Sequence, residues 1–412
     1  MSIDKRPFTI NPWQVTINKG LSLTHWFEKE YNDPQTTGNK MEDVEMKAAL
    51  LREQKKPLEI DDVRIDKPGP HEVLVRSVAA GVCHSDLHFV DGSYPMPVPA
   101  IPGHESAGVV EAVGADVTYV KPGDHVVAIL TPFCGECEYC LSGHMSLCRM
   151  VNPTTGQRGA GQSPRLSTAE GKAIFQFGTI AAFAEQTLVH DHSIAKISPE
   201  MPLDRAALIG CAVVTGLGTI FHTVKVEPGA TVVVIGCGGV GLMCINGAYI
   251  AGAARIIAVD MEQEKLKLAG VFGATDTVNA KDGDPVEKIM DLTGGSGVQY
   301  SIEAIGLKKT AEQAFRMLRP GGVATVIGMI PIGTNIEIHG PDLLRERRLQ
   351  GTFMGSNRFR TDFPRFIDYY LQGRLKLDEL ISDRIRLEDV NAALDNLKQH
   401  KGTVARQVIM FD

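Results

Sequence analysis

The sequence has no run of about 18 consecutive apolar residues, the length that a helix needs to cross a bilayer. Its start, MSIDKRPFTINPWQ, has neither the apolar core of a secretory signal nor the Arg-rich, acid-poor composition of a transit peptide. It also has no basic excess, since 42 Lys and Arg stand against 49 Asp and Glu, for a formal net charge of -7. We therefore expect a cytoplasmic protein that acts on a small molecule, with no membrane segment and no nucleic-acid partner.

The 412 residues suffice for two domains, and we find no internal repeat or low-complexity tract. Residues 1–45 are polar and irregular but hold both tryptophans, Trp13 and Trp26, so we predict an ordered N-terminal extension. Short β-rich runs such as HEVLVRSVAA and SAGVVEAVG then follow, separated by Pro and Gly turns. This pattern predicts a mostly β domain.

Beyond about residue 212 the pattern changes to strands that alternate with amphipathic helices. The strand-like runs are TVVVIG, RIIAVD, DTVNA, QYSIEAI and VATVIGM. Such alternation is typical of an α/β fold with a doubly wound parallel sheet. We predict that residues 213–353 form this dinucleotide-binding domain, and that residues 354–412, which end in the β-like VARQVIMF, rejoin the first domain at 46–212.

A glycine loop directly follows the strand TVVVI and precedes a helix. Gly236, Gly238 and Gly241 form G-x-G-x-x-G, with Gly239 and Val240 between them, and this context favours a pyrophosphate at the helix N-terminus. Asp260 ends the next strand, where its carboxylate can accept from ribose hydroxyls and repel a 2'-phosphate, which favours NAD over NADP. A simple tight turn with Asp260 as a helix cap is the alternative, and methyltransferase-like sheets also carry glycine loops.

Four of the eight cysteines form one compact motif, C-x2-C-x2-C-x7-C, in CGECEYCLSGHMSLC. Its members, Cys134, Cys137, Cys140 and Cys148, can close a tetrahedral, structural zinc site with no open position. Free thiols and an iron–sulfur cluster are alternatives, although the spacing matches neither common ferredoxin pattern. A nucleic-acid zinc finger fits poorly because Glu136 and Glu138 would face phosphate.

Cys83, His104 and Cys211 each stand in a polar, glycine-flanked setting, but their spacing alone does not join them. Taken singly, a buried Cys is usually a small hydrophobic residue and a lone His a satisfied core or surface residue. Cys237 and Cys244 fit this simpler interpretation, because one lies in the glycine loop and the other on the helix after it.

Six motifs occur in one order: GVCHSDLH, PGHESAGVVEAVG, the four-cysteine lobe, GCAVVTGLGT, GCGGVG and GTVARQVIMF. With them the chain, from about Val44 to Asp412, resembles the zinc-containing medium-chain alcohol dehydrogenase family. The resemblance implies a GroES-like catalytic domain, a Rossmann NAD-binding domain, an active site in the cleft between them, and homodimers or homotetramers built through the coenzyme domains. It also implies two Zn²⁺ per subunit.

By this resemblance Cys83, His104 and Cys211 are the ligands of a catalytic zinc, which leaves a fourth position for water or the substrate oxygen. The zinc would lower the pKa of an alcohol so that hydride passes to the nicotinamide. Ser85 would accept the alcohol proton and His88 would pass it, by way of the nicotinamide ribose, to solvent.

The resemblance assigns further supporting roles. Asp86 would orient the imidazole of His104, and Glu105 would be an acidic neighbour of the metal. The remaining residues that match coenzyme contacts are His84, Lys265 and Arg406, near phosphates or ribose, and Thr215, near the nicotinamide.

Within this family the chain also resembles the glutathione-dependent formaldehyde dehydrogenases, through LSTAEGKAIFQFGTIAAFAEQTLV. Those enzymes carry acidic residues after the first ligand motif and an arginine after the fourth lobe cysteine to hold glutathione. Here Asp91 stands alone in VDGSYPMPVPA, the lobe is followed by Arg149-Met-Val-Asn-Pro, and His88 replaces the usual tyrosine. We interpret this glutathione site as incomplete and expect a primary alcohol as substrate.

Leu130, at a position often held by a larger aromatic residue, indicates room for bulky or aromatic alcohols. Three alternatives stay open. The enzyme could use S-(hydroxymethyl)glutathione, or keep NAD tightly bound and pass electrons to an external acceptor, as a bacterial subgroup with similar HSDLHFVDGSYPMPVP and C-terminal segments does. The third alternative is a catalytically silent protein that binds zinc and NAD, against which the complete set of ligand and proton-relay residues argues.

Overall fold

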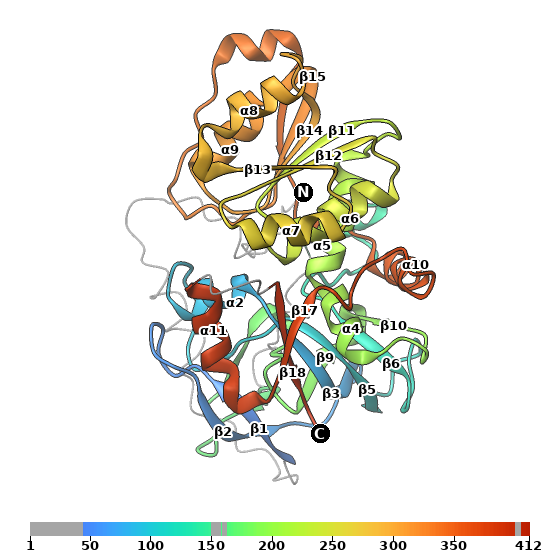
Figure 1. Ribbon diagram of the computed structural model, residues 1–412. Helices are drawn as coiled ribbons and strands as arrows, with labels where there is room; N and C mark the ends of the chain where they lie inside the picture. Colours follow the sequence, from blue (N-terminus) through green and yellow to red (C-terminus); the bar gives the residue numbers. More distant parts are fainter. Residues whose placement is uncertain (1–43, 150–157, 159–162, 400–404) are drawn as a thin grey trace, which may run out of the picture.

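The computed structural model describes residues 44–149, 158, 163–399 and 405–412 (Figure 1). The predicted extension, residues 1–45, lies outside this part except for its last two residues. In the view of Figure 1, a parallel sheet with its helices occupies the upper half and the other sheets occupy the lower half.

The upper sheet has six strands in the order β13-β12-β11-β14-β15-β16, and all neighbours are parallel. The chain starts in the middle at β11, builds outward to β13, and then returns to build the other side, so the strand order reverses between β11 and β14. Ligands bind at such a switch point in open α/β sheets. The bounds are β11 (Thr231–Ile235), β12 (Arg255–Asp260), β13 (Asp276–Asn279), β14 (Val298–Glu303), β15 (Leu318–Val326) and β16 (Arg348–Gly351).

Four helices connect these strands and pack on them: α6 (Gly239–Ile250), α7 (Gln263–Val271), α8 (Pro285–Leu292) and α9 (Lys308–Arg316). Local sequence sets their limits. At α8, for example, the Asp284 carboxylate accepts from Val286 N at 3.0 Å, and Pro285 occupies the first turn, where its missing N–H costs nothing. The strand–helix alternation confirms the predicted α/β fold class with a doubly wound sheet.

The lower half is built around a seven-stranded sheet of order β10-β6-β5-β3-β18-β17, with β9 also paired to β3. The C-terminal strand β18 lies between β3 and β17, so the chain end returns to the sheet that its first half builds. The bounds are β3 (Glu72–Val82), β5 (Glu105–Val113), β6 (His125–Ala128), β9 (Gln186–His190), β10 (Ile194–Lys196), β17 (Ile381–Ile385) and β18 (Arg406–Met410).

Two smaller sheets flank this one. The first comprises β1 (Val44–Leu50), β2 (Glu59–Ile65) and β7 (Leu166–Ser167), and the second comprises β4 (Ala100–Ile101) and β8 (Phe175–Gln176). The other α-helices among the described residues are α2 (His84–Val90), α3 (Glu138–Leu141), α4 (Leu203–Ala207), α5 (Ala212–Gly218), α10 (Phe359–Leu371) and α11 (Val390–Lys398).

Helix α5 continues into a π-helical turn, η6 (Thr219–Val224), and sits where the two halves meet. One buried apolar cluster holds residues of both halves, including Ile129, Leu217 and Val234. Within the described residues, no single helix is long and apolar enough to cross a membrane. The bent pair Leu203–Gly210 and Ala212–Val224 passes that test of length and composition only when its two helices are joined.

A buried ion pair joins the start of β3 to the segment before β7. Arg165 Nε donates to Glu72 Oε1 at 2.6 Å, and the two side chains are 1% and 8% exposed. Burial disfavours the carboxylate, but Arg158 and Arg165 outweigh it and lower the pKa of Glu72 to about 2. The two guanidinium groups therefore keep Glu72 ionised, and the buried Arg165 depends on that negative charge.

Glu72→Gln should lower the free energy of unfolding by about 3–5 kcal/mol at pH 7, because it leaves the buried Arg165 guanidinium without this carboxylate. Because the folded pKa of Glu72 lies below its ordinary value of 4.5, its contribution is present above about pH 4.5 and is lost as the pH falls toward 2. Urea denaturation at several pH values measures both effects. Glu264→Gln, in the exposed Lys267–Glu264 pair, is the control and should change stability by less than about 0.5 kcal/mol. Equal losses in both variants would refute a special role for the buried pair.

Candidate metal centres and coenzyme site

Three residues from separate parts of the chain converge at the N-terminus of α5. Cys83 lies between β3 and α2, His104 directly precedes β5, and Cys211 directly precedes α5. Their side chains are almost fully buried, and their ligand atoms, with a Glu105 carboxylate oxygen, all lie within 4.8 Å of one another. The structure therefore brings together the three residues whose sequence spacing could not join them.

The carboxylate of Asp86 orients His104. Asp86 Oδ1 lies 2.8 Å from His104 Nδ1, and its oxygens also accept from Gly103 N at 3.2 Å and Cys83 N at 2.9 Å. An acceptor at Nδ1 requires that nitrogen to carry the proton, so the lone pair is on Nε2. Nε2 lies 3.2 Å from Cys211 Sγ, which directs it toward the thiols.

The surroundings of Cys83 favour the thiolate, the form in which sulfur binds a metal. A hydrogen bond from Cys211 and the charge of Arg406, against the effect of burial, lower the pKa of Cys83 well below its ordinary value, whereas the same hydrogen bond and burial raise the pKa of Cys211. Burial raises the pKa of Glu105 to about 7, although Arg406 opposes this effect. Glu105 Oε2 is buried with no hydrogen-bond partner among the described residues.

These donors fit zinc. Two thiols and an imidazole are ligands that zinc prefers, and a tetrahedral site places a bound N and S about 3.5 Å apart, close to the His104–Cys211 distance. Three protein ligands leave one position open, which is the arrangement of a catalytic rather than a structural zinc site.

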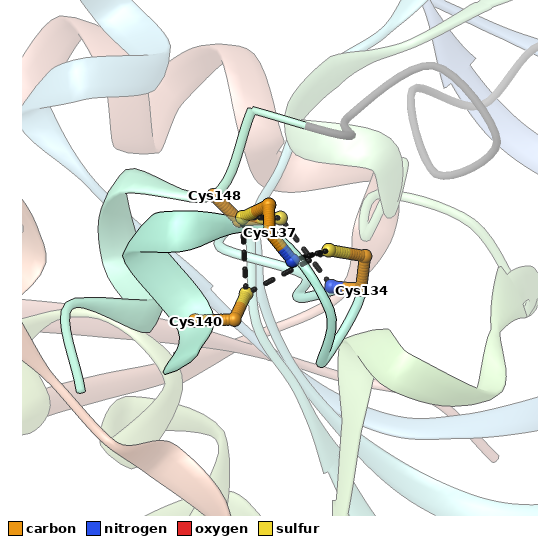
Figure 2. A group of neighbouring side chains, drawn as sticks. All are labelled: Cys134, Cys137, Cys140 and Cys148. Atoms are coloured by element: carbon orange, nitrogen blue, oxygen red, sulfur yellow. Dashed lines mark hydrogen bonds between the residues drawn. The ribbon is translucent and has the colours of Figure 1, made fainter. Parts of the chain in front are cut away.

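The four cysteines of the lobe form a second set (Figure 2). The Sγ–Sγ distances are 3.8 Å for Cys134–Cys140, 3.6 Å for Cys137–Cys140 and 3.9 Å for Cys137–Cys148. Four thiolates at about 2.3 Å from one zinc would lie about 3.8 Å apart, whereas a disulfide is about 2.05 Å long. All eight cysteines are described and none is in a disulfide. The lobe therefore fits a closed zinc site.

Backbone N–H groups prepare the lobe sulfurs for a metal. Cys137 N donates to Cys134 Sγ and Cys134 N to Cys148 Sγ, both at 3.3 Å. Burial opposes a thiolate at Cys137, but the backbone N–H groups of Cys140 and Arg149 and the neighbouring thiols lower its pKa to about 6. Deprotonated sulfur is the form that binds zinc.

The glycine loop lies at the switch point of the parallel sheet. Gly236 has φ +98°, and a Cβ on Gly241 would overlap Gly236 O, so both positions need glycine for the turn itself. A Cβ on Gly238 would meet no protein atom within 4 Å. Gly238 is the N-cap of α6, and the space beside it, at a helix N-terminus, fits the pyrophosphate of NAD.

Asp260 lies at the end of β12 beside this loop. Its Oδ2 accepts from Cys237 N at 2.8 Å and its Oδ1 from Glu262 N at 3.0 Å, which fixes the carboxylate near the turn. These bonds match the cap of the simpler interpretation, and they also hold the carboxylate where a ribose can reach it. Both interpretations of Asp260 are compatible with this geometry.

The structure places the other predicted coenzyme contacts around this loop and the metal site. Arg406 lies against Gly239, since a Cβ on Gly239 would overlap its guanidinium. The same guanidinium lies 3.4 Å from Cys83 Sγ and 3.2 Å from Glu105 Oε1. Burial raises the pKa of the loop thiol Cys237, and the nearby charge of Lys265 opposes that effect. Val240 lies in the first turn of α6, and Thr215 is buried in α5, its hydroxyl 3.5 Å from Met354 Sδ.

Ser85, His84 and His88 share helix α2. Ser85 Oγ lies 3.7 Å from Cys83 Sγ, beside the metal ligands. The His84 and His88 rings contact edge to face at 5.3 Å, and His88 is partly exposed. The Ser85 and His88 side chains lie three residues apart on the helix, which places them on one face. Their roles in proton transfer stay predictions.

An aromatic wall beside His104 did not emerge from the sequence. The Phe177 ring meets the His104 ring edge to face at 5.4 Å and the Phe89 ring at 4.5 Å. Gly178, with φ +61°, lets the chain pass close, because a Cβ there would lie 3.0 Å from His104 Cβ and 3.2 Å from Leu130 Cβ. Leu130, which the sequence did single out, therefore neighbours the ligand set.

Comparison with known proteins agrees with this geometry. Residues 69–199 match the model of the alcohol dehydrogenase GroES-like domain, and residues 239–371 match that of zinc-binding dehydrogenases. The chain is 39% identical to alcohol dehydrogenase class-3 of Pisum sativum, over 89% of this chain and 97% of the relative. It is 38% identical to S-(hydroxymethyl)glutathione dehydrogenase of Saccharomyces cerevisiae, over 89% of this chain and 96% of the relative.

Two solved structures have the same fold over 90% of this chain and their own full lengths. An alcohol dehydrogenase zinc-binding domain protein from Burkholderia ambifaria has a TM-score of 0.85 at 34% identity, and benzyl alcohol dehydrogenase from Acinetobacter calcoaceticus has a TM-score of 0.83 at 30% identity. The chain therefore belongs to the zinc-containing medium-chain alcohol dehydrogenase family and is a zinc-dependent, NAD-linked alcohol dehydrogenase.

Proposed function

We propose that the enzyme exchanges hydride between a primary alcohol or aldehyde and NAD at a zinc held by Cys83, His104 and Cys211. The buried convergence of these three donors, with Asp86 behind His104, carries the proposal. When bound, zinc would polarise the alcohol oxygen as a Lewis acid and NAD would accept the hydride.

Residues of the protein would carry the alcohol proton to solvent. Ser85, which lies beside Cys83, would take the proton of the alcohol hydroxyl, and His88 would release it to solvent near neutral pH. Asp86 holds the imidazole of His104 in the tautomer that can bind a metal. Burial of the ligand set keeps bulk water from the reacting atoms.

The substrate that fits best is an aromatic or other bulky primary alcohol. Phe177 presents its ring to His104 and Phe89 packs against Phe177, while Leu130 leaves more space than an aromatic residue would. Aromatic rings favour an apolar, planar group at this place. One structural relative is a benzyl alcohol dehydrogenase, which supports the same substrate class.

Glutathione adducts are the second candidate, because curated relatives include an S-(hydroxymethyl)glutathione dehydrogenase. Arg149, however, pairs with Glu138 at 2.9 Å and lies over the Tyr139 ring. Asp91 caps α2 and accepts from Ser93 N at 2.9 Å. Both charged groups have partners within the protein, and Asp91 is the single acid of its stretch, which favours the simpler alcohol.

Alcohol oxidation by the Cys83→Ala variant tests the proposal. The variant should retain about one zinc and lose at least about a thousandfold in kcat/KM for benzyl alcohol with NAD, because the zinc's stabilisation of charge is worth several kcal/mol. Cys244→Ala, which removes a buried thiol of α6 outside both ligand sets, should keep two zinc ions and nearly full turnover.

The same assays compare benzyl alcohol with S-(hydroxymethyl)glutathione as the substrate. They are repeated with an artificial electron acceptor on enzyme that was purified without added NAD. Equal turnover by Cys83→Ala and wild type would refute the catalytic zinc, and no turnover by the wild type would favour a silent zinc- and NAD-binding protein. A higher kcat/KM for the glutathione adduct would refute the aromatic-alcohol assignment. Retained NAD with turnover only in the presence of the acceptor would identify an acceptor-dependent enzyme.

We also propose that Asp260 selects NAD. Asp260→Ser should lower the ratio of kcat/KM for NAD over NADP by at least about tenfold, since like charges placed together cost several kcal/mol. Asp291→Ser, at an exposed acid in the last turn of α8, is the matched control and should leave the ratio unchanged. An unchanged ratio in Asp260→Ser would assign the preference to another residue.

We further propose a cytoplasmic homodimer or homotetramer that assembles through the coenzyme domain. The location, which cell fractionation would test, is supported by the eight reduced cysteines. Strand β16 is an open sheet edge, and Leu344, on the nearby turn η8 (Gly340–Arg345), is 89% exposed.

Sedimentation velocity at micromolar concentration should give two or four times the chain mass of 44.6 kDa. Leu344→Asp should shift the protein toward smaller species because it would place a charge in the proposed contact between subunits. Leu371→Asp, at an exposed leucine that ends α10, should leave the mass unchanged. A monomeric wild type would contradict the proposal.

A further inference from the structure

A polar pocket lies beside the zinc lobe, and none of the proposed ligands of either zinc and no residue of the glycine loop lines it. Its volume is about 490 Å³, and its described lining contains no acidic and no apolar side chain. The lining residues are Gly143, His144, His222, Thr223, Lys225, Ser356 and Arg358. Cations, imidazoles and hydroxyls thus share one cavity.

Three segments far apart in sequence build this pocket. The zinc lobe supplies Gly143 and His144, and the turn η9 (Met354–Ser356) with Arg358 supplies a second wall. The end of η6 supplies His222, Thr223 and Lys225. Helix α5 and η9 touch backbone to backbone, because a Cβ on Gly218 would clash with Gly355 O. This close approach brings the second wall beside η6, and the Thr223 and Ser356 hydroxyls lie 2.9 Å apart.

Two lining residues have a left-handed backbone without being glycine. Lys225 has φ +57° and Ser356 has φ +50°. Such conformations are uncommon for residues with a side chain, and they concentrate at functional sites where the surroundings hold them in place. Lys225 is the C-cap of η6, where helices commonly end in this conformation, so Ser356 is the lining residue whose strain helix capping does not explain.

The two cations of the pocket are not paired with an acid within the described part of the chain. Lys225 and Arg358 form no ion pair with any described residue. Asp362 is the acid behind the pocket, but it is 2% exposed, and its oxygens accept from Arg358 N at 2.7 Å and contact His222 Nε2 at 2.9 Å. Arg358 Nε also donates to Gly143 O at 3.3 Å, which holds the guanidinium across the lobe.

We propose that this pocket binds a phosphate group, either as inorganic phosphate or as the phosphate of an organic monoester. Lysine, arginine and hydroxyl groups in one concave site match the charge and the acceptor oxygens of phosphate. A bound phosphate would link the zinc lobe to η6 and η9. Since η6 continues the helix that begins after Cys211, the bound phosphate would stabilise both the zinc lobe and the region of the Cys83, His104 and Cys211 site.

Calorimetric titration of the zinc-loaded enzyme tests this site, with saturating NAD present so that the coenzyme occupies its own phosphate-binding loop. Inorganic phosphate and glycerol 3-phosphate are titrated separately into wild type and variants. At least one of them should bind wild type with a dissociation constant of about 1 mM or below. Lys225→Gln and Arg358→Gln should each weaken that binding about tenfold, the effect expected for one charge-assisted hydrogen bond.

Lys309→Gln, at an exposed lysine of α9 outside the pocket, is the control and should change binding by less than about twofold. Zinc content and melting temperature without phosphate confirm that each variant is folded, and Thr223→Val offers a neutral variant if a charge change unfolds the chain. Tighter binding of glycerol 3-phosphate would assign an organic phosphate, and binding of inorganic phosphate alone would assign the free ion. Absence of binding by wild type, or equal weakening in Lys309→Gln, would overturn the proposal.

Discussion

The metal centre depends on the carboxylate of Asp86. It is fully buried, and a buried charge is costly unless donors surround it. Its partners are Cys83 N, Gly103 N and His104 Nδ1, so a single side chain ties the end of β3 to the turn before β5. The same contacts fix one ligand's tautomer and another ligand's backbone, which means that the ligand geometry is set by the fold before any metal arrives.

The sequence predicts what is local and misses what the fold brings together. Strand–helix alternation, the glycine loop and the four-cysteine spacing are read within short windows, and all three appear in the structure as predicted. Cys83, His104 and Cys211 belong to segments whose proximity follows from sheet order, so only family resemblance could group them. The aromatic contact of Phe177 with His104 was missed because a phenylalanine in FQFGT carries no sign of what it faces.

Arg406 illustrates how register determines a residue's surroundings. From the sequence it matches a coenzyme contact, and it does lie against Gly239. Strand β18 pairs antiparallel with β3 so that Gln407 lies opposite Val82, which puts Arg406 next to Cys83. Its buried guanidinium therefore reaches Cys83 Sγ and Glu105 as well as the glycine loop, and joins the metal site electrostatically to the coenzyme site. No local pattern could have predicted that register.

The two metal sites differ in how far the surrounding structure depends on the metal for its stability. The lobe helix α3 has no buried residue, and its sulfurs are held by backbone N–H groups of the same short loop. Such a segment cannot bury enough apolar surface to fold by itself, so zinc must supply the stability of the lobe. The residues Cys83, His104 and Cys211 are instead buried in cores that form from both sheets. That fold does not depend on the metal for its stability, so the zinc there can keep one coordination position open for substrate. This difference is the physical basis for catalysis at one site and structure at the other.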